Sequence, residues 1–124
     1  MFKESINGNV VIWYYVEDLP SAVEWYSNVL GKKPSSNIDV AYFFEINAQT
    51  KLAISNRFKA KAENTLPNSV ALDLQSDDIF ETHRILKEKG VHVDEIANPI
   101  LNYHEFYIQD LDNNQIRIHS FMKG

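Results

Sequence analysis

The chain has 124 residues, a formal net charge of -5, 44% hydrophobic and 23% charged residues, and no cysteine. These values are typical of one soluble globular domain, and the missing cysteines exclude disulfides and thiolate metal ligands. The negative charge disfavours a nucleic-acid partner, and no apolar stretch approaches the roughly 20 residues that a membrane-spanning helix needs. The first residues lack the apolar core of a secretory signal, so we expect a cytoplasmic protein.

The first half of the chain predicts a strand, a capped helix and a hairpin, in that order. Val10–Val16 is β-branched or aromatic throughout, which favours a buried strand. A helix follows, with Asp18 or Ser21 as its N-cap and Gly31 as its stop signal. The hairpin is predicted from residues 39–47 and 51–55.

The second half repeats this order. The spacing predicts, in turn, a strand at 69–75, a helix ending at Gly90, a short strand at 91–96, a break at Asn98 and Pro99, a strand at 104–109, a turn at 110–114 and a strand at 115–121. A repeat at this scale determines the architecture. We therefore expect an α+β fold in which two βαβββ modules form a curved, mainly antiparallel sheet around a cleft.

The two modules, at about 8–56 and 69–122 with a linker at about 57–68, are expected to form a single domain over 1–124. Each module has one sheet face that its own helix covers and one that is bare. Two bare faces turned toward each other would make the cleft, and function is expected there.

Two motifs resemble those of a known family. The run Val-Glu-Asp-Leu-Pro-Ser-Ala-Val-Glu-Trp-Tyr-Ser-Asn-Val-Leu-Gly at 16–31 resembles the opening signature of the glyoxalase, bleomycin-resistance and ring-cleaving dioxygenase superfamily, the vicinal oxygen chelate proteins. Asp-Leu-Asp-Asn-Asn-Gln-Ile at 110–116 resembles the closing turn and last strand of that family. The resemblance covers 10–121 and implies a paired βαβββ cleft that holds one divalent metal in enzymatic members.

The resemblance also implies where that metal would be bound. Its four ligand positions, on the first, fourth, fifth and eighth strands, fall on Val11, Ala53, Ser69 and Arg117. Valine and alanine have no lone pair, and a guanidinium is permanently cationic. Arg117 would repel a divalent cation by several kcal/mol at an effective dielectric of about 20. We therefore expect no metal cofactor, with a rebuilt divalent-metal site drawn from His83, His92, His104, His119, Glu45 and Glu105 as the alternative.

Strand alternation assigns side chains to the cleft face. The predicted ligand-binding residues are Trp13, Tyr15, Asp73, Tyr103, His104, Arg117 and His119. Trp13 and Tyr15 would stack on a planar or cationic ligand, unless they serve as core or interface packing. Arg117 would bind a carboxylate, phosphate or carbonyl, unless it pairs with Asp73 across neighbouring strands.

Three functions are compatible with these residues. The first is a metal-free, small-molecule-binding protein of the bleomycin-resistance type that forms a homodimer. The second is an enzyme, either a metal-dependent lyase, isomerase or dioxygenase with a non-standard ligand set, or a metal-independent enzyme with His104 or His119 as general base. The third is a structural or regulatory protein whose cleft is filled by side chains.

Overall fold

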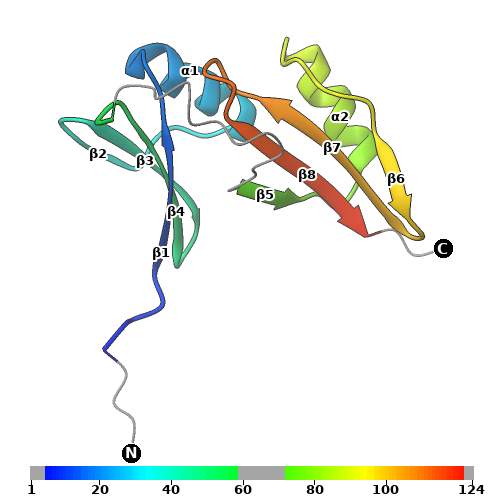
Figure 1. Ribbon diagram of the computed structural model, residues 1–124, viewed down its shortest axis with the longest axis horizontal. Coiled ribbons are helices and arrows are strands. Elements are labelled where there is room, and N and C mark those ends of the chain that lie inside the picture. The colour runs from blue at the N-terminus through cyan, green and yellow to red at the C-terminus, as the bar shows by residue number, and fades with distance from the viewer. Residues whose placement is uncertain (1–4, 59–71, 122–124) are drawn as a thin grey trace, which may run out of the picture.

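The computed structural model describes residues 5–58 and 72–121, which form two βαβββ modules, each with a four-stranded sheet (Figure 1). The first module consists of β1 (Val10–Tyr15), α1 (Leu19–Leu30), β2 (Ser36–Ile38), β3 (Ala41–Asn47) and β4 (Thr50–Ser55). The second consists of β5 (Leu72–Gln75), α2 (Ile79–Glu88), β6 (Ala97–Ile100), β7 (Tyr103–Gln109) and β8 (Gln115–Phe121). The predicted internal repeat and the α+β class are confirmed.

The two sheets have the same strand order. It is β1-β4-β3-β2 in the first module and β5-β8-β7-β6 in the second. In each sheet the first and last strands of the module pair in parallel, and the remaining pairs are antiparallel. The parallel pair requires a crossover, which the helix and the intervening strands of each module supply.

Both helices begin at an aspartate cap. The side chain of Asp18 accepts a hydrogen bond from the backbone N–H of Ser21 at 3.2 Å, and Asp78 accepts one from Glu81 at 3.1 Å. These contacts satisfy backbone donors that the first helical turn leaves free. Gly31 ends α1 in the left-handed region with φ 70°, a conformation that favours glycine.

The core lies between each sheet and its helix. On β1, Tyr14 is 6% exposed and faces the core, whereas its neighbour Trp13 is 39% exposed on the opposite face. The remaining large core side chains come from both modules and include Val16, Tyr26, Phe44, Leu52, Ile54, Ile79, Leu86, Phe106, Ile108, Ile116 and Ile118. Each sheet therefore keeps one face, called its open face here, that the helix of its module does not cover (Figure 1).

Two tyrosines of the first module connect it to the second. The Tyr14 hydroxyl donates to the backbone carbonyl of Gln115 and accepts from the backbone N–H of Leu72, both at 2.8 Å. The Tyr26 hydroxyl, on a side chain with no exposed surface, donates to the Asp110 carboxylate at 2.6 Å. In Figure 1, α1 lies beside the turn between β7 and β8, where the Tyr26 contact is made.

The structure corrects one predicted strand and adds one that was not predicted. The strand expected at 91–96 is wrong: only Val93 of that segment forms a bridge, to Ile108, and β6 instead covers the predicted break at Asn98 and Pro99. Proline is accommodated because β6 is an edge strand, where a missing backbone N–H removes no necessary pairing. The short strand β2 was not predicted, since its three residues carry no alternating pattern.

Part of the predicted organisation cannot be compared with the structure. Residues 59–71, which include most of the predicted linker together with Ser69 and Ala71, lie outside the described residues. Within the described ranges, neither helix is long and apolar enough to cross a membrane.

Candidate functional site

The open face of the first sheet carries an aromatic cluster. Trp13 stacks on Tyr15 with ring centroids 6.4 Å apart, and its edge contacts Phe43 at 5.7 Å. Tyr15 contacts Phe58, which is 45% exposed, at 5.1 Å. We call Trp13, Tyr15, Phe43 and Phe58 the aromatic face. Such a surface can stack on a planar ligand.

The family's metal positions do not fit a metal on this sheet. Ala53 is fully buried, and its register partners on the two neighbouring strands are Trp13 and Phe43. Val11 pairs in register with Lys51, a cation. Hydrocarbon side chains offer no lone pair, and a nearby ammonium group repels a divalent ion. Ser69, the third position, lies outside the described residues.

The open face of the second sheet carries a polar cluster instead. Asp73 and Arg117 are register partners in the parallel pair β5–β8, and the Arg117 Nε donates to Asp73 Oδ2 at 2.8 Å. The second Asp73 oxygen, Oδ1, lies 2.6 Å from Nδ1 of His119, which is next on the same face of β8. Asp73 therefore bridges the guanidinium and the imidazole. Arg117 is the fourth metal position, and its cation does not fit a metal ligand either.

Strand β7 completes the polar cluster with Tyr103, Glu105 and Tyr107. Glu105 accepts from the Tyr103 hydroxyl at 2.9 Å and from the Tyr107 hydroxyl at 3.3 Å. The Tyr107 hydroxyl also accepts from Arg117 Nη1 at 3.3 Å. These residues alternate along β7, so they share the face of Arg117 and His119 on β8. We keep the name polar cluster for Asp73, Tyr103, Glu105, Tyr107, Arg117 and His119.

The contacts within the polar cluster fix two protonation states. The hydrogen bonds from Arg117 to Asp73 and to Tyr107 raise the pKa of the Arg117 guanidinium, which stays cationic. Burial, followed by the hydrogen bond to Glu105, raises the pKa of Tyr103 to about 12. Tyr103 is therefore a neutral phenol at neutral pH, and Arg117 keeps the charge that disfavours a metal ion.

The structure places His104 apart from the other predicted site residues. His104 lies next to Tyr103 on β7, and adjacent strand residues face opposite sides of the sheet. Its ring contacts Phe80 of α2 at 5.6 Å, and its Nδ1 is buried without a hydrogen-bond partner among the described residues. Tyr103 and His104 therefore do not line one cleft.

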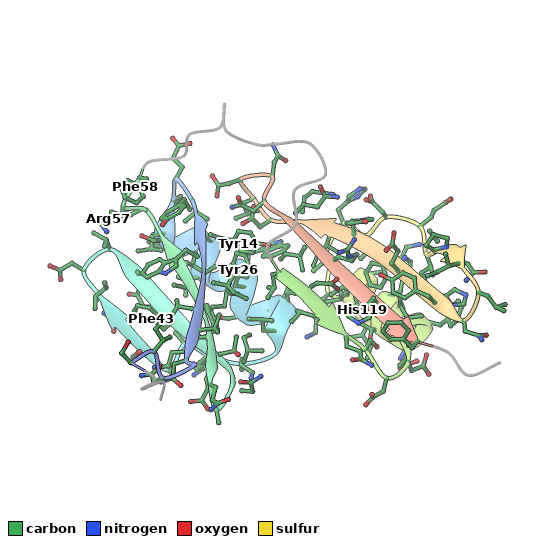
Figure 2. The ribbon with its side chains drawn as sticks, turned by 60° about the horizontal axis from the view of Figure 1, so that its bottom comes forward. Tyr14, Tyr26, Phe43, Arg57, Phe58 and His119 are labelled. Carbon is green, nitrogen blue, oxygen red and sulfur yellow. The ribbon has the colours of Figure 1, made fainter. Side chains whose placement is uncertain are left out.

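The aromatic face and the polar cluster lie on separate parts of a single chain. Figure 2 shows Phe43 on the first sheet, Phe58 beside it and His119 on the second sheet, with α1 near the junction. No hydrogen bond, ion pair or ring contact joins a described side chain of the aromatic face to one of the polar cluster. The predicted shared cleft is thus not formed by these contacts within one chain.

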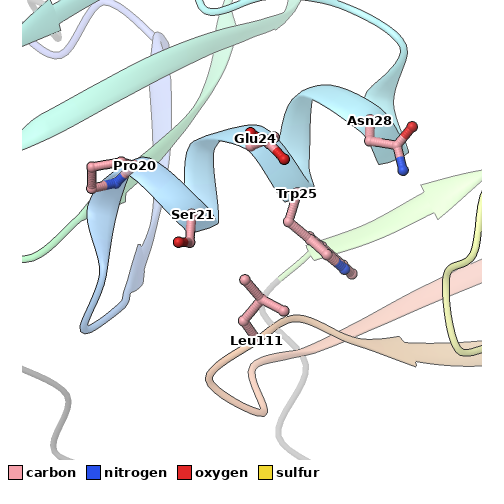
Figure 3. A pocket seen from close by; sticks show the side chains of 6 residues that line it. All are labelled: Pro20, Ser21, Glu24, Trp25, Asn28 and Leu111. Carbon is pink, nitrogen blue, oxygen red and sulfur yellow. The ribbon is translucent and has the colours of Figure 1, made fainter.

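A surface pocket of about 590 Å³ lies elsewhere, between α1 and the turn that joins β7 to β8 (Figure 3). Its lining residues are Pro20, Ser21, Glu24, Trp25, Asn28 and Leu111. None of the predicted site residues lines it. Within the described ranges, no group of three or more histidine, cysteine, aspartate or glutamate side chains could hold a metal ion.

Sequence reasoning named Glu105 only as a ligand of the alternative metal site, left Phe43 and Tyr107 undecided between core and cleft, and missed Phe58. Strand parity could have found Glu105 and Tyr107, because both alternate with Tyr103. For Phe43 the register of β3 was needed, and that follows from its pairing with β4. No sequence signal indicated Phe58, which follows β4 rather than belonging to it.

Comparisons with solved structures support the same fold. TnmS3, an antibiotic-binding protein from Streptomyces sp. CB03234, is 20% identical, with a TM-score of 0.73 over 95% of this chain and 98% of that one. A lactoylglutathione lyase from Agrobacterium tumefaciens is 17% identical, with a TM-score of 0.70 over 93% of this chain and 94% of that one. A glyoxalase/bleomycin resistance protein/dioxygenase from Alicyclobacillus acidocaldarius is 14% identical, with a TM-score of 0.74 over 94% of this chain and 93% of that one.

No curated protein is similar to the chain at a significant level. The family profile described as Glyoxalase/Bleomycin resistance protein/Dioxygenase superfamily matches residues 9–118. This match spans both modules, including β1 and most of β8. The resemblance seen in the two motifs therefore extends over the fold, and the chain belongs to the Glyoxalase/Bleomycin resistance protein/Dioxygenase superfamily.

Proposed function

We propose that this protein is a metal-free, small-molecule-binding member of its superfamily, of the bleomycin-resistance type. The observation that carries the proposal is the aromatic face, in which Trp13 is 39% exposed although it is a large apolar side chain. Exposed aromatic surface next to a few convergent polar groups is typical of small-molecule sites. TnmS3, an antibiotic-binding protein, has the same fold.

The proposed absence of a metal follows from the chemistry of three of the four family positions. Val11 and Ala53 carry hydrocarbon side chains, and Arg117 already pairs with Asp73 at 2.8 Å. A divalent ion bound at the family's metal position would lie close to the Arg117 guanidinium, which its contacts with Asp73 and Tyr107 hold in place. The proposed ligand is therefore recognised by stacking and hydrogen bonding.

The proposal includes a homodimer, because one chain leaves its two open faces apart. It also includes a cytoplasmic location. In the dimer, the aromatic face of one copy would cover the polar cluster of the other and enclose the ligand between them. The symmetry of a two-fold pair would create two equivalent sites. Analytical ultracentrifugation that finds only monomers at micromolar concentration would contradict this part of the proposal.

Ligand binding can be measured through the fluorescence of Trp13. The chain has two tryptophans, so a Trp25→Phe background leaves Trp13 as the single reporter. We expect 4-nitroanisole, a planar neutral quencher, to reduce the emission with a saturable dependence on its concentration. A linear, non-saturable dependence would count against a binding site. In the wild-type background, Trp13→Leu should weaken binding about 2-fold to 10-fold through lost stacking.

Metal content is the second measurement. We expect the protein, purified without chelators, to contain no stoichiometric zinc, nickel, manganese or iron by plasma mass spectrometry. A tightly bound metal at one equivalent per chain would overturn the metal-free proposal and favour the metal-dependent alternative. The lactoylglutathione lyase with the same fold keeps that alternative open.

A metal-independent enzyme is the second candidate, and the pairing of His119 with Asp73 at 2.6 Å favours it. An imidazole oriented by a carboxylate is a common general base. Once a turnover is measured, replacing His119 by glutamine should abolish it, and replacing His104 should not. Unchanged turnover after the His119 substitution would remove this candidate.

A further inference from the structure

His119 is held in one orientation on three sides. The Asp73 Oδ1 lies 2.6 Å from its Nδ1. The Tyr103 ring stacks on the imidazole with centroids 5.9 Å apart and an interplanar angle of 22°. The Phe121 ring contacts it edge-on at 5.4 Å and 78°. A rotamer fixed in this way presents the remaining ring edge, which carries Nε2, in one direction.

The Asp73 contact also fixes the tautomer of His119. An ionised carboxylate can only accept hydrogen bonds, so Nδ1 carries the proton in the neutral imidazole. The lone pair then belongs to Nε2. Among the described residues, Nε2 makes no hydrogen bond. His119 thus offers a proton acceptor toward the open face of the second sheet, and Asp73 stabilises the imidazolium that would form.

Arg117 provides a hydrogen-bond donor beside this acceptor. Its Nε donates to Asp73 and its Nη1 to Tyr107, which leaves Nη2 without a partner among the described residues. Arg117 and His119 are two residues apart on β8, or about 7 Å along the strand, and Asp73 joins them with one oxygen each. Both groups therefore lie on the open face of the second sheet.

The charge of the polar cluster selects the kind of ligand. Asp73 and Glu105 are acidic and Arg117 is cationic, so the cluster carries one net negative charge while His119 is neutral. Among the described residues, Tyr103 and Tyr107 are the other titratable groups facing the imidazole and the guanidinium, and both are phenols. A permanent anion such as a phosphate meets unfavourable charge here. A neutral ligand that releases its proton to a group inside the site adds no net charge and so does not meet this repulsion.

We propose that the polar cluster binds a planar weak acid, a phenol or enol, and that the ligand gives its O–H proton to Nε2 of His119. In this step the O–H bond breaks and an N–H bond forms, both electrons of the former bond stay on the ligand oxygen, and no other reactant is needed. Asp73 holds the imidazolium, and Arg117 Nη2 together with the new N–H donates to the ligand anion. This inference rests on the proposed binding function and names its ligand class.

The absorption spectrum of 4-nitrophenol tests the inference, because its phenol and phenolate forms absorb at different wavelengths. The probe is titrated with the full-length protein over a range of pH. We expect the pKa of the bound probe to fall by at least about one unit, which is a tenfold preference for the phenolate. The methyl ether 4-nitroanisole has no acidic proton and reports aromatic binding alone.

Two variants assign the effect to the polar cluster. His119→Gln keeps hydrogen-bonding capacity but cannot take up the proton, so it should abolish the shift. Asp73→Asn should reduce the shift, and it decides the question if the first variant does not fold. The matched control is His92→Gln, whose side chain is 81% exposed and which should leave the shift intact.

The outcomes separate the two proposals. If 4-nitroanisole binds and 4-nitrophenol binds with its free pKa, or if His119→Gln and Asp73→Asn both retain the shift, the inference is overturned and the binding function stands. If neither probe binds, both are overturned. A shift that disappears in His119→Gln and persists in His92→Gln supports the assignment.

Discussion

Replacing Tyr26 by phenylalanine should cost about 2 kcal/mol of unfolding free energy. The lost hydroxyl donates to the buried Asp110 carboxylate at 2.6 Å, and hydrogen bonds to charged groups contribute about 1.5–3 kcal/mol. Asp110 keeps three other donors, namely the backbone N–H groups of Asp112 and Asn114 and the Asn114 side-chain amide. These remaining contacts limit the loss.

Urea unfolding followed by circular dichroism measures this loss. With a denaturant slope of about 2 kcal/mol per molar, the midpoint of Tyr26→Phe should fall by about 1 M. The control is Tyr42→Phe, because the Tyr42 hydroxyl makes no hydrogen bond to a described residue. This control should stay within about 0.5 kcal/mol of wild type. A Tyr26→Phe midpoint equal to that of the control would refute the reasoning.

The pH dependence gives a second readout of the same contact. Burial, and then the charge of Asp110, raise the pKa of Tyr26 well above its ordinary value. In the unfolded chain a tyrosine ionises near pH 10, so the unfolded state binds fewer protons than the folded state above that pH. The contribution of Tyr26 is therefore fully present below about pH 10 and decreases above it. The stability difference between wild type and Tyr26→Phe should shrink there by about 1.4 kcal/mol per pH unit.

Three further predictions concern the helix ends and the metal positions. Asp18→Ala should lower the unfolding free energy by about 1 kcal/mol through loss of the α1 cap, whereas Asp77→Ala, which removes no cap, should change it little in the same urea titration. Gly31→Ala should cost about 1 kcal/mol in thermal unfolding, because its φ of 70° strains any residue with a Cβ, and an unchanged midpoint would contradict the assigned conformation. Arg117→Glu should bind Zn²⁺ more tightly than wild type in calorimetric titration, since a cation becomes a ligand beside Asp73 and Glu105, and equal affinity would argue against the placement of Arg117.

Local signals predicted the parts of the fold that depend on neighbouring residues. The last strand has the predicted bounds 115–121, and Asp18 caps α1 as one of the two expected residues. These features depend on alternation and capping within a few positions. The short strand before β7 was misplaced, because its position is determined by pairing with β7 rather than by its own composition.

For the candidate site, the sequence indicated which residues of one strand share a face, because alternation is local. It did not indicate how strands and modules are placed relative to one another. Parity along β1 and β8 assigned Trp13, Tyr15, Arg117 and His119 to one shared cleft. The structure has Trp13 and Tyr15 on the open face of the first sheet, and Arg117 and His119 on the open face of the second. His104 was grouped with Tyr103 although neighbours on a strand face opposite sides. The contact between Tyr26 and Asp110 joins residues 84 positions apart, and no local pattern encodes a pairing at that separation.

The edges of the two sheets differ in how well they resist pairing with another chain. The edge strand β2 is only three residues long, and the edge strand β6 contains Pro99 and an irregular register. These are features that limit edge-to-edge aggregation. Val10–Tyr15 of β1 has none of them, with six uncharged residues and Val10, Val11 and Trp13 at least 39% exposed. Among the described edge strands, β1 is therefore the one most open to pairing with another chain, and a charged residue introduced there would oppose that pairing.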